Sequence, residues 1–374
     1  MYGYDDLLNP IKRNFQLGMI NFLDVNWKAN VWSAASLFLM GTLVCGTCTY
    51  FCRHVTVIEN IQDAAEAGVV FGSAFALYVK LIVSLLKRKE LISFSDSISQ
   101  QYSQSLNEHP DITNVFARHF SLITKVFSVV VCLLPILYTI TSLVGNDEPR
   151  HPIFMEFPFF PSKGWPFYHI IYLMQIIIMG VGCNLALGVE FLTFFFIQYV
   201  CCRIEILAHM VEHWNGKLEE NHCTAKRNNL LLEEIVRYHS SVKRNMAAIK
   251  RIFSPGLMAT LLTNSMVICM CLFIISVNPL PKICSHIVFA LTQTFMYCFV
   301  GNLLKNQNDN LVEKVMLIDF YYLDVPERKS YMNVVQSSCN PIKLQSYFVT
   351  VDMALFFKVV KFAYSVFSLM KTRI

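Results

Sequence analysis

The chain has 374 residues, of which 55% are hydrophobic and only 15% are charged. Soluble domains carry about 25% charged residues. This composition, with a mean hydropathy of +0.45, therefore excludes a soluble globular protein and indicates a membrane protein with several spans. The formal net charge of +5 does not indicate a nucleic-acid partner, because the basic residues are spread over the connections rather than gathered on one face.

Apolar runs long enough to cross a bilayer recur along the chain, since a spanning helix needs about 20 residues. They cover residues 31–52, 64–86, 121–144, 167–199, 255–277, 285–304 and 347–370. We therefore predict an all-α membrane protein with seven transmembrane helices. Residues 1–30 are expected to form a cytoplasmic N-terminal segment, and residues 31–304 a bundle of six spans. The fourth run exceeds the bilayer thickness, so its cytoplasmic end is expected to project into water.

The lysines and arginines outside the spans fall mostly in alternate connections, on the same side as the N-terminus. By the positive-inside rule, this distribution places the N-terminus in the cytoplasm and the C-terminus outside the cell. G-protein-coupled receptors have seven spans in the opposite orientation. The chain also lacks Asp-Arg-Tyr after the third span and Asn-Pro-x-x-Tyr in the seventh, so we exclude that class of receptor.

The connections on the cytoplasmic side carry helical patterns of their own. Residues 200–254 contain an amphipathic pattern that predicts a helix running directly into the fifth span. Residues 305–345 contain a second such pattern at Asn310–Tyr322, followed by interruptions at Pro326 and Pro341. Together these segments predict a helical cytoplasmic anchor layer beneath the membrane.

The outer connection at residues 145–166 combines prolines with closely spaced aromatic residues. Two interpretations remain open for it. It forms an aromatic belt at the membrane–water interface, or it forms a stiff apolar lid over a cavity between the spans.

The last segment, Ser346–Ile374, has neither proline nor glycine and predicts the seventh span, but its apolar character is interrupted. Lys361 and Tyr364 fall on one helical stripe with Phe357 and Ser368. Lipid would penalise the lysine, so the stripe is expected to face protein or water. One interpretation is a helix packed inside the bundle, with lysines that reach the interface. The other is the wall of a water-filled conduit built by several copies of this helix.

Other classes of protein have little support in the sequence. Cys45, Cys48 and Cys52 share one helix face, but they lie inside an apolar run, so core packing is favoured over a metal site. We find no nucleophile motif and no glycine-rich phosphate loop, and we expect neither an enzyme nor a cofactor. Glu190 and Gly180–Gly182 in the fourth span are the only hints of a transporter. Glu190 is expected to pair with a lysine or a backbone group inside the bundle, or to lie near the inner surface.

The middle and the C-terminal third of the chain carry short motifs in a characteristic order. They are FPFFP followed by WPFYHIIYLMQ, then EIVRYH, FMYCFVGNLL, DFYYLDVPERKSY, Asn340-Pro341 and AYS. Together with the inverted seven-span plan, these motifs resemble the insect odorant receptor family, most clearly from about Phe157 to the end. Two residues depart from the family pattern. Ala363 replaces a hydroxyl residue in the Ala-Tyr-Ser triplet, and Phe320 stands near a position where many members carry tryptophan.

This resemblance implies an odour-gated, non-selective cation channel in the plasma membrane of sensory neurons. In that family a tuning subunit assembles with a common co-receptor subunit in a tetramer, and the last span of each subunit surrounds the pore. The chain looks like a tuning subunit, whose other partners would be a small volatile odorant, membrane lipid and permeating cations, with no nucleic acid. The related gustatory receptor channels are the nearest alternative, and a secondary transporter is the alternative from another class.

In the family, odorants bind in an apolar pocket between spans two, three, four and six. The matching positions here are Phe71, Phe75, Tyr138, Ser142, Tyr172, Gln175, Ile176, Phe289 and Gln293. Bulky apolar groups near the outer end of the last span can block hydrated ions by dewetting. The pore and gate candidates there are Tyr364, Phe367, Met370 and Lys371. Four copies of Lys371 would repel cations, so we expect that this chain does not conduct alone.

Overall fold

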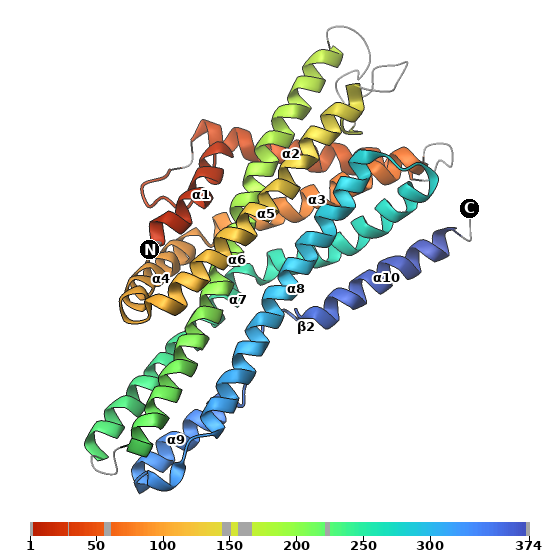
Figure 1. The fold of residues 1–374 in the computed structure, drawn as a ribbon. Coiled ribbons are helices and arrows are strands. Elements are labelled where there is room, and N and C mark those ends of the chain that lie inside the picture. The colour runs from red at the N-terminus through yellow and green to blue at the C-terminus, as the bar shows by residue number, and fades with distance from the viewer. Residues whose placement is uncertain are drawn as a thin grey trace.

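The structure is a computed structural model, and it describes residues 3–28, 30–55, 61–143, 151–155, 167–220 and 225–371. Within these ranges the chain is almost entirely helical (Figure 1). In chain order the elements are α1 (Tyr4–Leu17), α2 (Val31–His54), α3 (Ile61–Leu86), α4 (Arg88–Glu108), α5 (Pro110–Leu143), α6 (Phe167–Glu220), α7 (Ala225–Val277), α8 (Pro281–Met316), η2 (Phe320–Tyr322), α9 (Val325–Ser338), β1 (Gln345–Ser346), β2 (Val349–Thr350) and α10 (Met353–Lys371). Most of the aromatic outer connection at residues 145–166 lies outside the described residues, so both interpretations of it stay open.

Six helices within the described ranges are long and apolar enough to cross a membrane, namely α2, α3, α5, α6, α7 and α8. Helix α10, with 19 residues, is the seventh long apolar helix. Five of these helices, α2, α3, α6, α7 and α8, each contain one predicted span, and α5 and α10 overlap the other two, so the predicted all-α membrane fold is confirmed. The side of the membrane that each terminus faces stays a prediction.

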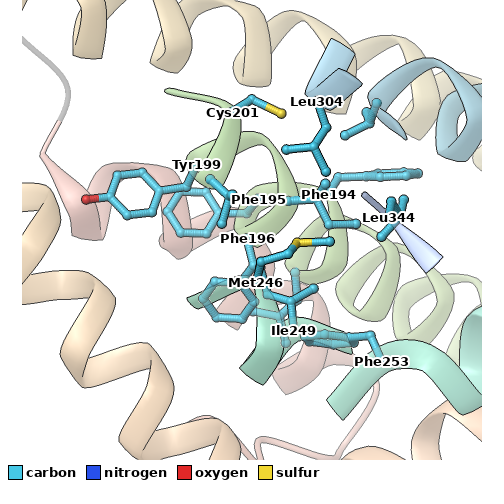
Figure 2. Packing of buried hydrophobic residues seen from close by; sticks show 14 of the residues in the cluster. Phe194, Phe195, Phe196, Tyr199, Cys201, Met246, Ile249, Phe253, Leu304 and Leu344 are labelled. Carbon is cyan, nitrogen blue, oxygen red and sulfur yellow. The ribbon is translucent and has the colours of Figure 1, made fainter. Parts of the chain in front are cut away.

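Helix α6 forms the centre of the bundle. It is apolar on nearly every side between Leu187 and Ile204, and every residue of that stretch is buried. The consecutive rings of Phe194–Phe196 point in different directions (Figure 2), and each packs against a different neighbouring helix. The partners, with the distances between ring centroids, are Tyr297 of α8 at 4.8 Å, Phe120 of α5 at 5.4 Å and Phe253 of α7 at 6.0 Å.

Three of the spanning helices extend far beyond the thickness of a bilayer. Helix α6 has 54 residues, which corresponds to about 80 Å at about 1.5 Å per residue. Helix α7 has 53 residues and includes the amphipathic part of residues 200–254, so the predicted run of that helix into the fifth span is confirmed. The C-terminal ends of α6 and α8 and the N-terminal end of α7 lie together with α9 at one end of the molecule (Figure 1). This arrangement agrees with the predicted anchor layer.

The segment at residues 305–345 differs in detail from the prediction. Helix α8 continues without a break from the sixth span and ends at Met316, so Asn310–Tyr322 is not a single helix. Pro326 does not interrupt structure but lies in the first turn of α9, where its missing N–H leaves no hydrogen bond unmade. Asp324 and Glu327 form a capping box at this helix start, because each side chain accepts a hydrogen bond from the other residue's backbone N–H.

The last span begins at Met353 rather than at Ser346. The strands β1 and β2 precede it and pair antiparallel, with Ser346 opposite Val349. Asp352 then starts the helix, since its carboxylate accepts a hydrogen bond of 2.9 Å from the backbone N–H of Leu355. A pattern free of proline and glycine permitted a helix over the whole segment, but the contacts of the hairpin decide where the helix starts.

Candidate functional site

A cavity of about 130 Å³ lies between the helices of the bundle and is lined by residues of α2, α3, α5, α6, α7 and α8. Its wall is mostly apolar, and Ile153 from the segment before α6 closes part of it. A cavity of about 150 Å³ in another protein admits benzene, so this one suits a small apolar ligand. The ionisable or hydrogen-bonding side chains in the wall are Ser73, Lys80, Tyr138, Cys183, Glu190, Asn264, His286 and Gln293.

The structure brings together only part of the predicted binding set. Tyr138, Phe289 and Gln293 line the cavity. The remaining predicted residues lie outside its lining, namely Phe71, Phe75, Ser142, Tyr172, Gln175 and Ile176.

The residues outside the lining have other contacts that explain their positions. Phe75 is 39% exposed and its ring lies 5.8 Å from that of Phe71, so this pair packs toward the outside of the bundle. The hydroxyl groups of Ser142 and Tyr172 lie 3.3 Å apart and connect α5 to α6.

Gln175 lies outside the cavity lining and binds the backbone of a lining residue, Ile153. Its amide oxygen accepts a hydrogen bond of 3.1 Å from the backbone N–H of Ile153, and its amide nitrogen donates one of 3.0 Å to the carbonyl of Ile153. Gln175 therefore holds a residue that lines the cavity, rather than contacting the cavity itself.

A buried ion pair forms one polar part of the wall. Lys80 of α3 donates to one carboxylate oxygen of Glu190 in α6, and Tyr297 of α8 donates to the other. Gln293 donates to the same carboxylate at 2.7 Å and accepts from Asn264 of α7 at 2.9 Å. Of the three alternatives expected for Glu190, the structure shows the pairing with a lysine inside the bundle. The network connects four spanning helices.

A second polar group consists of Ser73, Tyr138 and His286, from three different spans. The imidazole of His286 lies between the two hydroxyl groups, and all three side chains line the cavity. Neither His286 nor Lys80 was among the site residues predicted from the sequence. A detectable signal was present, because each is an ionisable residue within an apolar span, and such residues mark functional sites by default.

Helix α10 lies along one side of the bundle, where it packs against α7 and α8 (Figure 1). Phe367 is half-buried and packs on the apolar cluster that includes Ala363, whereas Tyr364 is 61% exposed. Phe357 and Lys361, from the same predicted stripe as Tyr364, are exposed as well. The helix is therefore not enclosed by the bundle. The side chains of Met370 and Lys371 lie outside the described part of the chain.

Comparison with known families gives a match over most of the chain. A sequence profile described as 7tm odorant receptor matches residues 60–364. Odorant receptor 56a of Drosophila melanogaster is 21% identical, with 92% of this chain and 87% of that protein aligned. Putative odorant receptor 92a of the same fly is 20% identical, with 88% and 84% aligned. Odorant receptor 82a is 20% identical over 59% of this chain, and the match spans 57% of that protein's length.

Solved structures with the same fold come from another insect. Olfactory receptor OR5 of Machilis hrabei in complex with eugenol has a TM-score of 0.76 to this chain at 13% identity, and the match covers 99% of this chain and 100% of that one. The structure of the same receptor, described without a ligand, has a TM-score of 0.73 at 14% identity. The likeness extends over the whole length of both chains, and at this level of identity it concerns the fold.

Proposed function

This chain belongs to the 7tm odorant receptor family, and on that premise we propose that it is the odorant-tuning subunit of a ligand-gated, non-selective cation channel. The expected resemblance to insect odorant receptors is thereby confirmed. In the proposal, a small volatile odorant enters the cavity between the spans, and the resulting change opens a pore formed by α10 helices of a heterotetramer with a co-receptor subunit. The three relatives described above are odorant receptors, which favours this assignment over the gustatory receptor and transporter alternatives.

The observation that carries the proposal is the mostly apolar cavity inside the bundle. Odorants are small and apolar, and their transfer from water into such a cavity is favourable. Burying about 150 Å² of ligand surface contributes about 4 kcal/mol at about 25 cal/mol/Å². This gain is modest, so shape and a few polar contacts decide which odorant binds.

Helix α8 offers a physical connection between the cavity and α10. Phe289 and Gln293 of α8 line the cavity. Farther along the same helix, the ring of Phe295 lies 5.6 Å from that of Phe356 in α10. A ligand opens the channel only if it binds the open arrangement more tightly than the closed one. We propose that a shift of α8 on ligand binding moves α10.

The exposed face of α10 supports its role as a wall of the pore. Lys358 and Lys361 are exposed in an otherwise apolar helix, and lipid contact would be unfavourable for both charges. Neighbouring subunits and a water-filled pore would remove this penalty. In this arrangement Tyr364 and Lys361 are better placed to face the pore than Phe367, which packs against its own bundle.

The proposal predicts odour-evoked cation current that requires a co-receptor. An odorant panel is applied to cells that express this chain with a co-receptor, and to cells that express either subunit alone. Current is expected for at least one odorant in the combined cells only, with selectivity that the co-receptor alone does not show. Odour-evoked current in cells expressing this chain alone would contradict the heteromeric part of the proposal. Surface-expressed complexes that stay silent to the whole panel would contradict the channel itself.

The pore assignment predicts a change in conduction for Lys361→Gln. Removing a positive charge from the conduit lowers the barrier for cations, so the unitary current of the heteromeric channel is expected to rise, most strongly at low ionic strength. The control is Lys329→Gln in α9, an exposed lysine outside α10. Equal unitary currents for both variants would remove Lys361 from the pore.

A further inference from the structure

Three side chains on the cavity wall are connected by hydrogen bonds. The hydroxyl of Ser73 lies 2.7 Å from Nε2 of His286, and the hydroxyl of Tyr138 lies 3.1 Å from Nδ1 of the same ring. The hydroxyl of Ser73 is also 3.3 Å from the carbonyl oxygen of Val69. All three side chains line the cavity, so a ligand in the cavity can contact Tyr138, the last member of this hydrogen-bonded group.

The surroundings of His286 favour its neutral form. The residue is 6% exposed, and both recorded partners of its ring nitrogens within the described ranges are hydroxyl groups. The nearby ammonium of Lys282, 5.7 Å from the ring centroid of Tyr138, is paired with the buried carboxylate of Glu66, and Lys80 is paired with Glu190. A buried imidazolium without a carboxylate partner is costly, so the ring has one N–H donor and one acceptor nitrogen.

One arrangement of the protons uses every hydrogen-bond donor of the three side chains. Ser73 donates to the carbonyl of Val69, Nε2–H of His286 donates to the hydroxyl oxygen of Ser73, and Tyr138 donates to Nδ1. The tyrosine oxygen then presents only lone pairs to the cavity. A ligand hydroxyl can donate to this oxygen and add a fourth hydrogen bond without changing any other.

If the direction of these hydrogen bonds is reversed, the three side chains make one hydrogen bond fewer. Ser73 donates to Nε2, Nδ1–H donates to the oxygen of Tyr138, and the bond to Val69 is given up. The tyrosine O–H then points into the cavity and has no acceptor until a ligand brings one. With a carbonyl or ether ligand, the three side chains and the ligand therefore form three hydrogen bonds in total. With a hydroxyl ligand, they form four.

We propose that this cavity selects small apolar ligands with a single hydroxyl group, alcohols or phenols, over carbonyl or ether ligands of the same skeleton. Tyr138 is the contacting residue, while His286 and Ser73 are positioning residues that keep its oxygen an acceptor. The inference rests on the proposed function, because it takes the cavity as the ligand site. One net hydrogen bond corresponds to a preference of roughly fivefold in affinity.

The test measures binding to the purified full-length chain in detergent. The probes are 2-heptanol and 2-heptanone, which share one skeleton, and the readout is the ligand-induced rise in unfolding temperature over a range of concentrations. The variants are the wild type, Tyr138→Phe, and the matched control Tyr172→Phe, whose hydroxyl contacts Ser142 and not the cavity. Channel currents for both probes are recorded in parallel, in cells with a co-receptor.

The proposal expects the alcohol to bind the wild type about fivefold more tightly than the ketone. The ratio should fall to about one in Tyr138→Phe and stay unchanged in Tyr172→Phe. Equal affinities in the wild type, no binding of either probe, or an unchanged ratio in Tyr138→Phe would each overturn it. Current that does not distinguish the probes would contradict this inference and leave the channel function standing. An alcohol preference in binding without current for any odorant would contradict the channel function and leave the inference standing.

Discussion

Glu190→Ala is expected to destabilise the folded chain by about 3–5 kcal/mol, because it leaves the Lys80 ammonium buried without its carboxylate. Lys80 is 5% exposed and Glu190 is 2% exposed, so water does not replace the lost partner. The same change also removes the acceptor for the hydroxyl of Tyr297 and for the amide of Gln293. The loss therefore affects contacts among α3, α6 and α8 at once.

The measurement is thermal unfolding of the purified full-length chain, together with its amount at the cell surface. A matched control is Glu233→Ala, which breaks the exposed ion pair with Arg237 in one helix and is expected to cost less than about 0.5 kcal/mol. The double variant Lys80→Met/Glu190→Gln removes both charges and keeps an amide oxygen for Tyr297, so it should recover most of the stability. An unfolding temperature of Glu190→Ala equal to that of the control would show that Lys80 finds another partner.

Gly301→Ala is expected to weaken the attachment of α10 to α8 and to abolish or strongly reduce ligand-evoked current. A Cβ atom at Gly301 would meet the carbonyl oxygen of Val351 at 1.9 Å, a distance that backbone atoms cannot accept. Val351 is buried, and its N–H donates to the carbonyl of Leu344 at 2.9 Å. The hairpin before α10 must therefore move, at a cost of about 3 kcal/mol if the helices keep their positions.

The matched control for this change is Gly180→Ala in α6. A Cβ there meets nothing within 4 Å, and alanine in a helix is expected to be neutral or to stabilise by up to about 1 kcal/mol. Current–concentration curves are compared for the two variants at equal surface expression. If both variants respond as the wild type does, the contact between α8 and the start of α10 does not transmit the ligand signal.

Some features could be read from local pattern because one physical requirement dominates them. Each membrane span needs an apolar run of fixed length, and the runs at residues 31–52 and 285–304 were found for that reason. The amphipathic continuation into α7 was found because its helical period persists beyond the apolar run. Glu190 was expected to have a partner because an isolated charge in an apolar helix is costly. Its pairing with Lys80 required the structure, since the two residues lie far apart in the chain.

Other features depend on contacts that no local pattern specifies. Helices α1 and α4 were not predicted, because their sequences are polar on average and their apolar faces have meaning only against a neighbour. In α1, Ile11 and Phe15 are completely buried, and a Cβ at Gly188 of α6 would lie only 2.8 Å from the ring of Phe15. The proline in α9 was taken as an interruption because its capping partners were not considered together with it.

The candidate site was also predicted only in part from the sequence. The family resemblance suggested nine residues for the ligand pocket, and the lining of the cavity includes Tyr138, Phe289 and Gln293 but not Tyr172 or Gln175. Helical rotation and the packing of side chains decide which residues of a span reach a cavity, and one sequence does not determine either.

The sequence by itself determined that this chain is a membrane protein with seven apolar helices, and its motifs indicated the odorant receptor family. These properties depend on the free energy of transfer of each segment and on short local motifs, so they do not require knowledge of neighbours. Only the tertiary structure decided that Lys80 faces Glu190, that His286 lies between two hydroxyl groups, and that α10 keeps an exposed face. Those arrangements depend on many weak contacts between distant parts of the chain. Packing determines them only when all the helices are in place.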